Sequence, residues 1–305
     1  MQPISVSQIV KNYGSTRALA GVDLEVNQGE IFGLIGPDGA GKTSLMRIIV
    51  SLIEADSGSV LFMGKDVSKH VSYVRSHIGY MPQRFSLYQD LTVNENMRFF
   101  GDLFKVPAED QERQMEELYG FSKLGPFKER RAGALSGGMK QKLALSCMLM
   151  HEPEVMILDE PTFGVDPVSR LELWEILFKL RDRGKTLVVS TPYMDEAGKC
   201  SRIALMHNGN ILAMNTPEKI LEDFIYPVYS IKTENPHVLY HALKEKLPEK
   251  NIQLFADSII LIDHLDWGGE KINAVLQEMN FNLQAEITAP VLENVFLDLM
   301  HNGEQ

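Results

Sequence analysis

A glycine-rich segment that ends in a lysine and hydroxyl residues carries the strongest chemical signal in the sequence. Its residues are Gly36, Pro37, Asp38, Gly39, Ala40, Gly41, Lys42, Thr43 and Ser44. They fit the spacing of a P-loop, which is glycine, four residues and then Gly-Lys-Thr. Glycines allow backbone N–H groups to converge on phosphate oxygens at a helix N-terminus. We therefore expect Lys42 to reach the β- and γ-phosphates of a nucleotide and the Thr43 hydroxyl to bind Mg²⁺.

The alternative for this segment is an ordinary Gly-rich turn between a strand and a helix. The combination of lysine, hydroxyl and flanking elements favours the P-loop over that alternative. Asp38 places a negative charge beside the predicted polyphosphate site, and we expect it to weaken binding slightly.

Two consecutive carboxylates follow the apolar run Val155–Leu158. The run predicts a buried strand, so Asp159 stands at the strand end, where it can hold Mg²⁺ directly or through water. Glu160, one residue further on, is placed to accept a proton from the attacking water or to orient it. A solvated strand end is the alternative, and the P-loop upstream makes it the weaker one.

A third segment, Leu135-Ser136-Gly137-Gly138, precedes a helical run that continues to Met150. Ser136 is a natural N-cap residue, and the two glycines leave the helix N-terminus open to an anion. A capped helix after a flexible loop is the structural alternative. The position of the segment between the P-loop and the acidic strand favours a functional role.

The elements that must position these residues alternate between apolar strands and helices, which argues for a largely parallel α/β sheet. Gly184 is well placed to end the longer helix. The expected strands are 4–7, 20–26, 30–35, 155–158 and 186–190, and the expected helices are 44–50, 109–119 and 168–181.

The pattern changes after residue 222. We expect a nucleotide-binding domain over 1–222, with a helical subdomain over about 86–150. Residues 223–305 should form a small α+β domain, for which a ferredoxin-like fold is one candidate. In this second domain the expected strands are 226–232, 252–255, 258–262 and 282–287, and the expected helices are 237–247, 270–279 and 291–300.

Composition narrows the classes of partner. The 305 residues carry 41 acids and 30 bases, a formal net charge of −11, which disfavours nucleic acid as a partner. Cys147 and Cys200 have no metal-ligand spacing and make no disulfide framework, which fits a reducing compartment. We expect no signal peptide and no segment that spans a bilayer.

Taken in order, these motifs resemble the nucleotide-binding subunit of an ABC transporter over roughly residues 1–220. The resemblance implies roles for three more residues. Tyr13, in Lys-Asn-Tyr-Gly, matches the aromatic side chain that stacks on adenine. Gln83, in Tyr-Met-Pro-Gln, matches the glutamine that touches Mg²⁺, takes part in catalysis and faces the membrane subunit. Asp166, in Phe-Gly-Val-Asp-Pro, matches the aspartate that links two active sites.

The resemblance also implies an assembly. In this family two domains sandwich two ATP molecules, each P-loop facing the Ser-Gly-Gly helix of the other domain, and hydrolysis opens the sandwich to drive transport. The implied partners are a second cassette and integral membrane permease subunits, at the cytoplasmic face of a bacterial-type cell membrane. Residues 86–100 resemble the groove for a short helix of the permease, and Pro290–Leu299 resembles the closing helix of ABC-2 type exporter subunits.

One position departs from the family pattern. Where the family has a histidine that contacts the γ-phosphate, this chain has Pro192, followed in register by Tyr193-Met-Asp-Glu-Ala. Proline has no side-chain donor or acceptor, and the loss of one preorganised polar contact costs roughly 10²–10³ in rate. Either the site is catalytically weak, which favours a heterodimer with a different cassette over a homodimer, or Glu160 suffices for catalysis without the histidine.

Two other classes of function stay open. One is a nucleotide-gated regulatory protein that binds ATP and hydrolyses little of it, which Pro192 keeps in consideration. The other is a soluble ABC ATPase outside transport, which the single cassette, the absence of long heptad runs and the acidity make weaker. A generic P-loop kinase has no role for the Ser136 segment.

Overall fold

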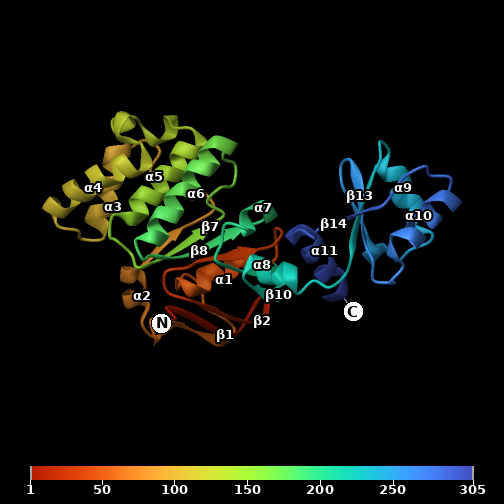
Figure 1. Ribbon diagram of the computed structural model, residues 1–305. Coiled ribbons are helices and arrows are strands. Elements are labelled where there is room, and N and C mark those ends of the chain that lie inside the picture. Colours follow the sequence, from red (N-terminus) through yellow and green to blue (C-terminus); the bar gives the residue numbers. More distant parts are fainter. Residues whose placement is uncertain (1, 304–305) are drawn as a thin grey trace. The chain divides into compact units, whose positions relative to one another are not determined.

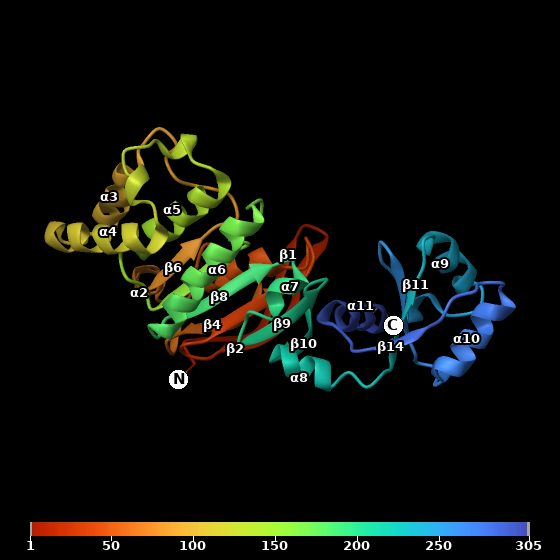
Figure 2. The same ribbon diagram turned by 45° about the horizontal axis from the view of Figure 1, so that its top comes forward.

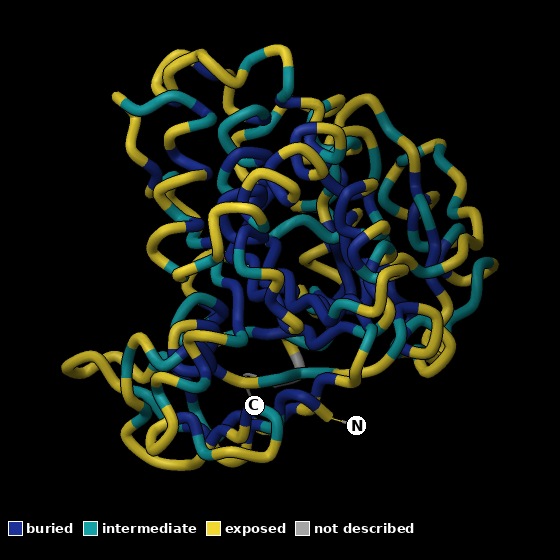
Figure 3. The backbone as a smooth tube through the Cα atoms, turned by 90° about the vertical axis from the view of Figure 1, so that its left-hand side faces the viewer, coloured by how far each residue is buried: buried dark blue, intermediate teal, exposed yellow. Residues whose placement is uncertain are grey.

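The structure is a computed structural model, and it describes residues 2–303. The chain divides into two compact units, Met1–Ile211 and Leu212–Gln305, which we call the N-terminal and C-terminal units. The prediction of a domain boundary at residue 222 stays a prediction. Figure 3 shows long buried stretches of chain in the interior and exposed turns on the outside.

A six-stranded sheet in the order β10-β9-β3-β8-β7-β6 forms the centre of the nucleotide-binding fold. The pairings β3–β9, β3–β8, β8–β7 and β7–β6 are parallel, as expected for strands that alternate with helices. Every residue of β3, β7 and β8 is buried, in keeping with their continuous apolar runs. The strands are β3 (Ile31–Ile35), β6 (Ile78–Met81), β7 (Val155–Asp159), β8 (Thr186–Thr191), β9 (Arg202–His207) and β10 (Asn210–Asn215).

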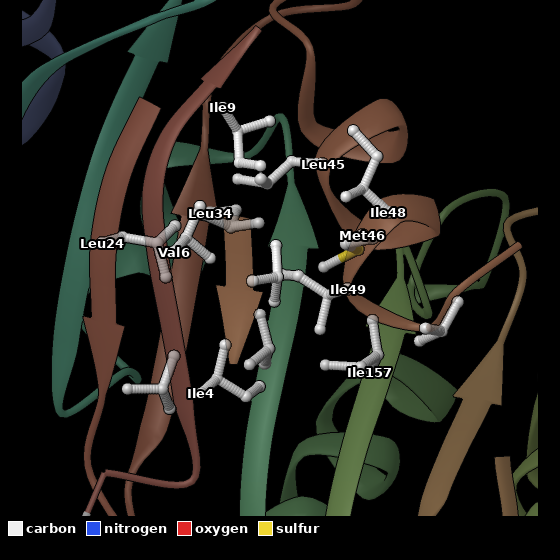
Figure 4. Packing of buried hydrophobic residues seen from close by; sticks show 14 of the residues in the cluster. Ile4, Val6, Ile9, Leu24, Leu34, Leu45, Met46, Ile48, Ile49 and Ile157 are labelled. Carbon is white, nitrogen blue, oxygen red and sulfur yellow. The ribbon is translucent and has the colours of Figure 1, made fainter. Parts of the chain in front are cut away.

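A second, antiparallel sheet was not part of the sequence prediction. Its order is β2-β1-β4-β5, with β1 (Ile4–Tyr13), β2 (Thr16–Val26), β4 (Ser57–Phe62) and β5 (Lys65–Asp66). Helix α1 (Lys42–Ile49) packs in the same hydrophobic cluster as strands of both sheets. Figure 4 shows Leu45 of α1 beside Ile9 of β1, and Ile49 of α1 near Ile157 of β7. The core of the N-terminal unit therefore holds α1, the helix that follows the P-loop, between two sheets.

Helices α3, α4 and α5 lie together at one end of the N-terminal unit (Figure 1). Helix α3 begins with a capping box, in which Thr92 and Glu95 exchange side-chain and backbone hydrogen bonds. Helix α6 packs against α5 and β8 (Figure 2). The helices of this unit besides α1 are α2 (Val71–His77), α3 (Val93–Leu103), α4 (Ala108–Ser122), α5 (Gly137–Leu149), α6 (Pro167–Asp182) and α7 (Met194–Ala197).

The C-terminal unit contains an antiparallel sheet in the order β12-β13-β11-β14. With helices after β11 and β13, this is the strand order of a ferredoxin-like βαββαβ unit, which the sequence indicated as possible. Apolar residues of α9 and α10 share one cluster with the sheet. The elements are α8 (Pro217–Glu222), β11 (Val228–Lys232), α9 (Pro236–Lys244), β12 (Ile252–Leu254), β13 (Ser258–Ile262), α10 (Gly268–Glu278), β14 (Glu286–Thr288) and α11 (Leu292–Gly303).

Candidate nucleotide site

The P-loop connects the buried strand β3 to the N-terminus of α1. Two of its glycines are required by close packing. A Cβ on Gly36 would come within 2.2 Å of the Met206 carbonyl oxygen, and one on Gly41 within 2.5 Å of the Ala18 carbonyl oxygen. Gly41 also has a φ of 105°, a left-handed conformation that glycine adopts without strain, at the residue that caps α1. The loop is therefore held close to β9 and β2, and the first N–H groups of α1 face the site.

Lys42 is the buried cation of this loop. Its Nζ donates a 2.7 Å hydrogen bond to the Gly36 carbonyl oxygen and a 3.0 Å hydrogen bond to that of Pro37. The same nitrogen lies 3.5 Å from Glu160 Oε1, and both side chains are only 4% exposed. A buried lysine that curls over its own loop presents a fixed positive charge where the phosphates of a nucleotide are expected.

The Asp159 carboxylate ends β7 and is 1% exposed. Its Oδ1 accepts hydrogen bonds from Thr43 Oγ1 at 3.1 Å and from Ser190 Oγ at 2.7 Å. Its Oδ2 is buried and has no hydrogen-bond partner among the described residues. A buried anionic oxygen without a partner is costly unless a cation or another donor engages it. Thr43 and Asp159, which the sequence predicts as metal ligands, therefore lie together with one oxygen still to be satisfied.

Glu160 has an unusual backbone. Its φ is 49°, in the left-handed region, which is uncommon for a residue with a side chain. The Gln83 amide, from the loop after β6, donates a 2.7 Å hydrogen bond to Glu160 Oε2. The structure thus brings together two residues that lie far apart in the sequence and that were both predicted to take part in catalysis.

A cavity of about 640 Å³ lies over the P-loop. Tyr13 lines it and is 48% exposed. Tyr13 Oη lies 3.5 Å from Ser44 Oγ. The sequence analysis missed four lining residues, because three come from β2 and one from the β9–β10 turn: Thr16, Arg17, Ala18 and Asn208. The lining residues are Tyr13, Thr16, Arg17, Ala18, Asp38, Gly39, Ala40, Gly41, Lys42, Thr43, Ser44, Gln83, Glu160 and Asn208.

The Ser136 segment does not line this cavity. Ser136 caps α5, as predicted, with its Oγ accepting from the Met139 N–H at 3.3 Å. Ser136 and Gly137 are exposed, whereas Gly138 is buried, and a Cβ on Gly138 would lie 2.4 Å from the Ser169 side chain. The open helix tip thus faces solvent and rests on the start of α6.

Asp166 lies beside this tip rather than in the cavity. It caps α6, accepting from the Ser169 N–H at 3.0 Å. Hydrogen bonds from Ser169 hold the pKa of the Asp166 carboxyl below its usual value. Of the four predicted residues, Ser136, Gly137 and Asp166 are therefore exposed and Gly138 is buried beneath them, and none of the four lines the cavity.

Pro192 follows the last residue of β8 and is partly buried. The segment after it is fixed by Glu196, which is fully buried and accepts hydrogen bonds from Arg170, Trp174 and Thr162. Arg170 also makes two 2.8 Å hydrogen bonds to Asp195. The segment is well ordered by these contacts, but at position 192 it offers the cavity no polar side chain.

Among the described residues, no group of three or more His, Cys, Asp or Glu side chains forms a metal site by itself. A hard cation such as Mg²⁺ keeps several waters and takes few protein oxygens together with substrate phosphates. The Thr43 hydroxyl and the unpartnered Asp159 Oδ2 fit that pattern.

Comparison with known proteins decides the family. The sequence family described as "ABC transporter" matches residues 19–163. Nod factor export ATP-binding protein I of Burkholderia lata is 36% identical over 224 residues, covering 73% of this chain and 74% of that protein. This chain belongs to the ATP-binding proteins of ABC transporters. The family binds and hydrolyses ATP, and its ATP-binding subunits work with membrane permease components.

A second relative extends the match into the C-terminal unit. "Probable multidrug ABC transporter ATP-binding protein YbhF" of Escherichia coli is 40% identical over 289 residues, covering 93% of this chain. The chain spans about half the length of that relative, 49%.

Solved structures agree with the fold. An ATP-binding subunit of an ABC transporter matches with a TM-score of 0.66 and 27% identity, over 72% of this chain and 92% of that one. The ATP-binding cassette MJ0796, solved as a dimer with ADP and phosphate, matches with a TM-score of 0.64 and 25% identity, over 70% of this chain and 98% of that one. In the described part of the chain, we find no helix with the length and apolar character needed to cross a bilayer.

Proposed function

We propose that this ABC protein is the ATP-hydrolysing subunit of an ABC-2 type exporter and acts at the cytoplasmic face of a cell membrane. The observation that carries the proposal is the convergence of Lys42, Thr43, Asp159, Glu160 and Gln83 at one edge of the parallel sheet. The names of the relatives, a multidrug transporter subunit and a Nod factor export protein, support an export role.

Each residue of the proposed site has a distinct role. The P-loop N–H groups and Lys42 bind the phosphates, and Tyr13 stacks on the base. Thr43 and Asp159 hold Mg²⁺, which when bound neutralises charge on the β- and γ-phosphate oxygens. Glu160, held by Gln83, orients the attacking water and accepts its proton at a carboxylate oxygen. The two groups next to the Glu160 oxygens, the Gln83 amide and the Lys42 ammonium, are both hydrogen-bond donors, so the Glu160 oxygens act as acceptors in this arrangement.

The exposed Ser136 tip supports the proposal of a cassette dimer. A capped helix with two glycines presents free N–H groups and a positive dipole end, which suit the γ-phosphate of a nucleotide bound to another cassette. Pro192 favours a heterodimer, because this chain then supplies an intact Ser136 tip to its partner while its own site turns over slowly.

The segment after Gln83 supports docking to a permease. Asn96 is fully buried and fixes that segment, accepting from the Tyr88 N–H at 3.1 Å and donating to the Tyr88 carbonyl oxygen at 3.0 Å. Tyr88 and Leu103 are 51% and 58% exposed, so apolar surface is left for a partner helix.

One observation favours a second candidate function. Because Pro192 gives the γ-phosphate no polar contact, a regulatory cassette that binds ATP and hydrolyses little of it is consistent with the same site. ATP binding without turnover, with or without a second cassette, would select this candidate.

The test is the ATPase activity of the purified chain, alone and with a candidate partner cassette and permease. The proposal predicts slow turnover by the chain alone, faster turnover in the complex, and its loss in Glu160→Gln while ATP binding is kept. Fast turnover by the chain alone that Glu160→Gln abolishes would overturn the heterodimer. Turnover that survives Glu160→Gln would overturn the assigned roles.

A further inference from the structure

A buried serine on β8, Ser190, links the two acidic residues of the candidate site. Ser190 is fully buried and stands opposite Asp159 in the parallel pairing of β8 with β7. Its Oγ donates a 2.7 Å hydrogen bond to Asp159 Oδ1 and accepts a 2.9 Å hydrogen bond from the Glu160 N–H. A hydroxyl has one hydrogen to donate, so the direction of both bonds is fixed by their partners, a carboxylate and an N–H group.

The bond to Asp159 determines which of its oxygens remains available. Thr43 and Ser190 both donate to Oδ1, one from the start of α1 and the other from β8. Oδ2 is left buried without a partner among the described residues. Groups that hydrogen-bond to a metal-binding carboxylate orient it and typically change metal affinity 10- to 100-fold.

The bond to Glu160 acts on its backbone. Glu160 has the left-handed φ of 49°, a conformation that persists only where the surroundings hold it. Ser190 accepts from the N–H of this residue, and the Phe163 N–H donates to its carbonyl oxygen at 3.1 Å. Ser190 thus holds the Glu160 N–H and the Asp159 side chain with one hydroxyl.

We propose that Ser190 is a positioning residue, whose hydroxyl fixes the metal-binding oxygen of Asp159 and the backbone turn that aims Glu160. This inference rests on the proposed function, in which these carboxylates serve Mg²⁺ and water. Alanine at position 190 removes both hydrogen bonds and leaves the Glu160 N–H buried without an acceptor. Threonine keeps a hydroxyl with the same donor and acceptor capacity.

The test uses Mn²⁺ in place of Mg²⁺ and measures its binding by electron paramagnetic resonance. The sample is the full chain with a non-hydrolysable ATP analogue. Analogue affinity in EDTA is measured beside it, and near-UV circular dichroism sets the folded fraction of each variant. Ser146→Ala is the matched control, since Ser146 is equally buried and its hydroxyl donates to the Lys142 carbonyl oxygen, outside the site.

We expect Ser190→Ala to lower Mn²⁺ affinity roughly 10- to 100-fold, with analogue affinity in EDTA within about threefold of wild type. Ser190→Thr should restore Mn²⁺ affinity, and Ser146→Ala should not change it. Unchanged Mn²⁺ affinity in Ser190→Ala, an equal loss of metal-free affinity, or no rescue by folded Ser190→Thr would overturn the inference. A wild-type chain that binds neither analogue nor Mn²⁺ would instead overturn the proposed function.

Discussion

Two buried aspartates, one in each unit, are used in opposite ways. Asp159 in the N-terminal unit is 1% exposed and Asp263 in the C-terminal unit is 4% exposed. Both carboxylate oxygens of Asp263 accept hydrogen bonds from the backbone. Oδ1 accepts from the N–H groups of Leu265 and Trp267, and Oδ2 accepts from that of Gly268. Asp159 uses only Oδ1 in this way, and its Oδ2 has no partner among the described residues.

The difference separates a structural carboxylate from a functional one. A buried charge that is fully hydrogen-bonded to nearby N–H groups fixes a turn, here the one that leads into α10. A buried charge with an unsatisfied oxygen costs stability, and functional sites are where such a cost is retained. Burial alone would not distinguish the two, since both are almost fully buried.

The largest effect that this comparison predicts is on metal binding. We expect Asp159→Asn to lower Mn²⁺ affinity in the presence of an ATP analogue by more than the roughly 10- to 100-fold typical of residues that only support a metal ligand. Thermal unfolding should be little affected, because a neutral amide removes the buried charge. Titration calorimetry and calorimetric melting measure the two effects. A large loss of stability with metal affinity retained would make Asp159 a structural residue like Asp263.

The second prediction is the converse of the first, a loss of stability without a loss of binding. Asp263→Ala leaves three backbone N–H groups in a partly buried turn without their acceptor, and we expect the C-terminal unit to lose about 3 kcal/mol of unfolding free energy. Denaturant unfolding measures the loss, and nucleotide affinity in the N-terminal unit should not change. Glu270→Ala, at an exposed position in the first turn of α10, is the control. An unchanged unfolding midpoint would contradict the role assigned to Asp263.

The third prediction concerns the exposed tip of α5. Ser136→Ala removes the N-cap, and we expect a loss of about 1 kcal/mol of unfolding free energy. Its effect on turnover should appear only in an assembled cassette pair, at the site of the partner cassette. Nucleotide affinity of the isolated chain, measured by calorimetry, should be unchanged. A loss of affinity in the isolated chain would place Ser136 in its own site.

The smallest effect is the pH dependence of the Asp166 cap. Because the folded pKa of Asp166 lies below its ordinary value of 3.8, its contribution is present above pH 3.8 and is lost as the pH falls through the folded pKa. Asp166→Ala should therefore melt below wild type at pH 7, and the difference should narrow below pH 3.8. A difference that stays constant across that range would contradict a cap that depends on the ionised carboxylate.

The sequence predicted those parts of the site that are local in the chain. The helix after the glycine-rich loop, the strand that leads to Asp159 and Glu160, and the Ser136 cap each depend on neighbouring residue types, and the structure contains all three. The helix that ends before Gly184 is also confirmed, with Gly184 at a φ of 83°.

Residues that reach the site through strand order could not be predicted from spacing. Ser190 lies next to Asp159 because β8 pairs with β7, and Asn208 lies near the P-loop because β9 pairs with β3. Arg17 reaches it from the antiparallel sheet, which the alternation pattern of strands and helices did not indicate. Pairing partners are set by tertiary packing, so a single sequence carries little signal for them.

Nucleotide affinity of a Lys42→Ala variant, measured by calorimetry with ATP in EDTA, tests the central claim most directly. The claim is that the P-loop, with its buried Lys42, is a phosphate-binding site. Removal of a buried charged donor should weaken ATP binding roughly 10- to 100-fold. Lys128→Ala, at an exposed position, should bind like wild type. Full ATP affinity in Lys42→Ala would contradict the account.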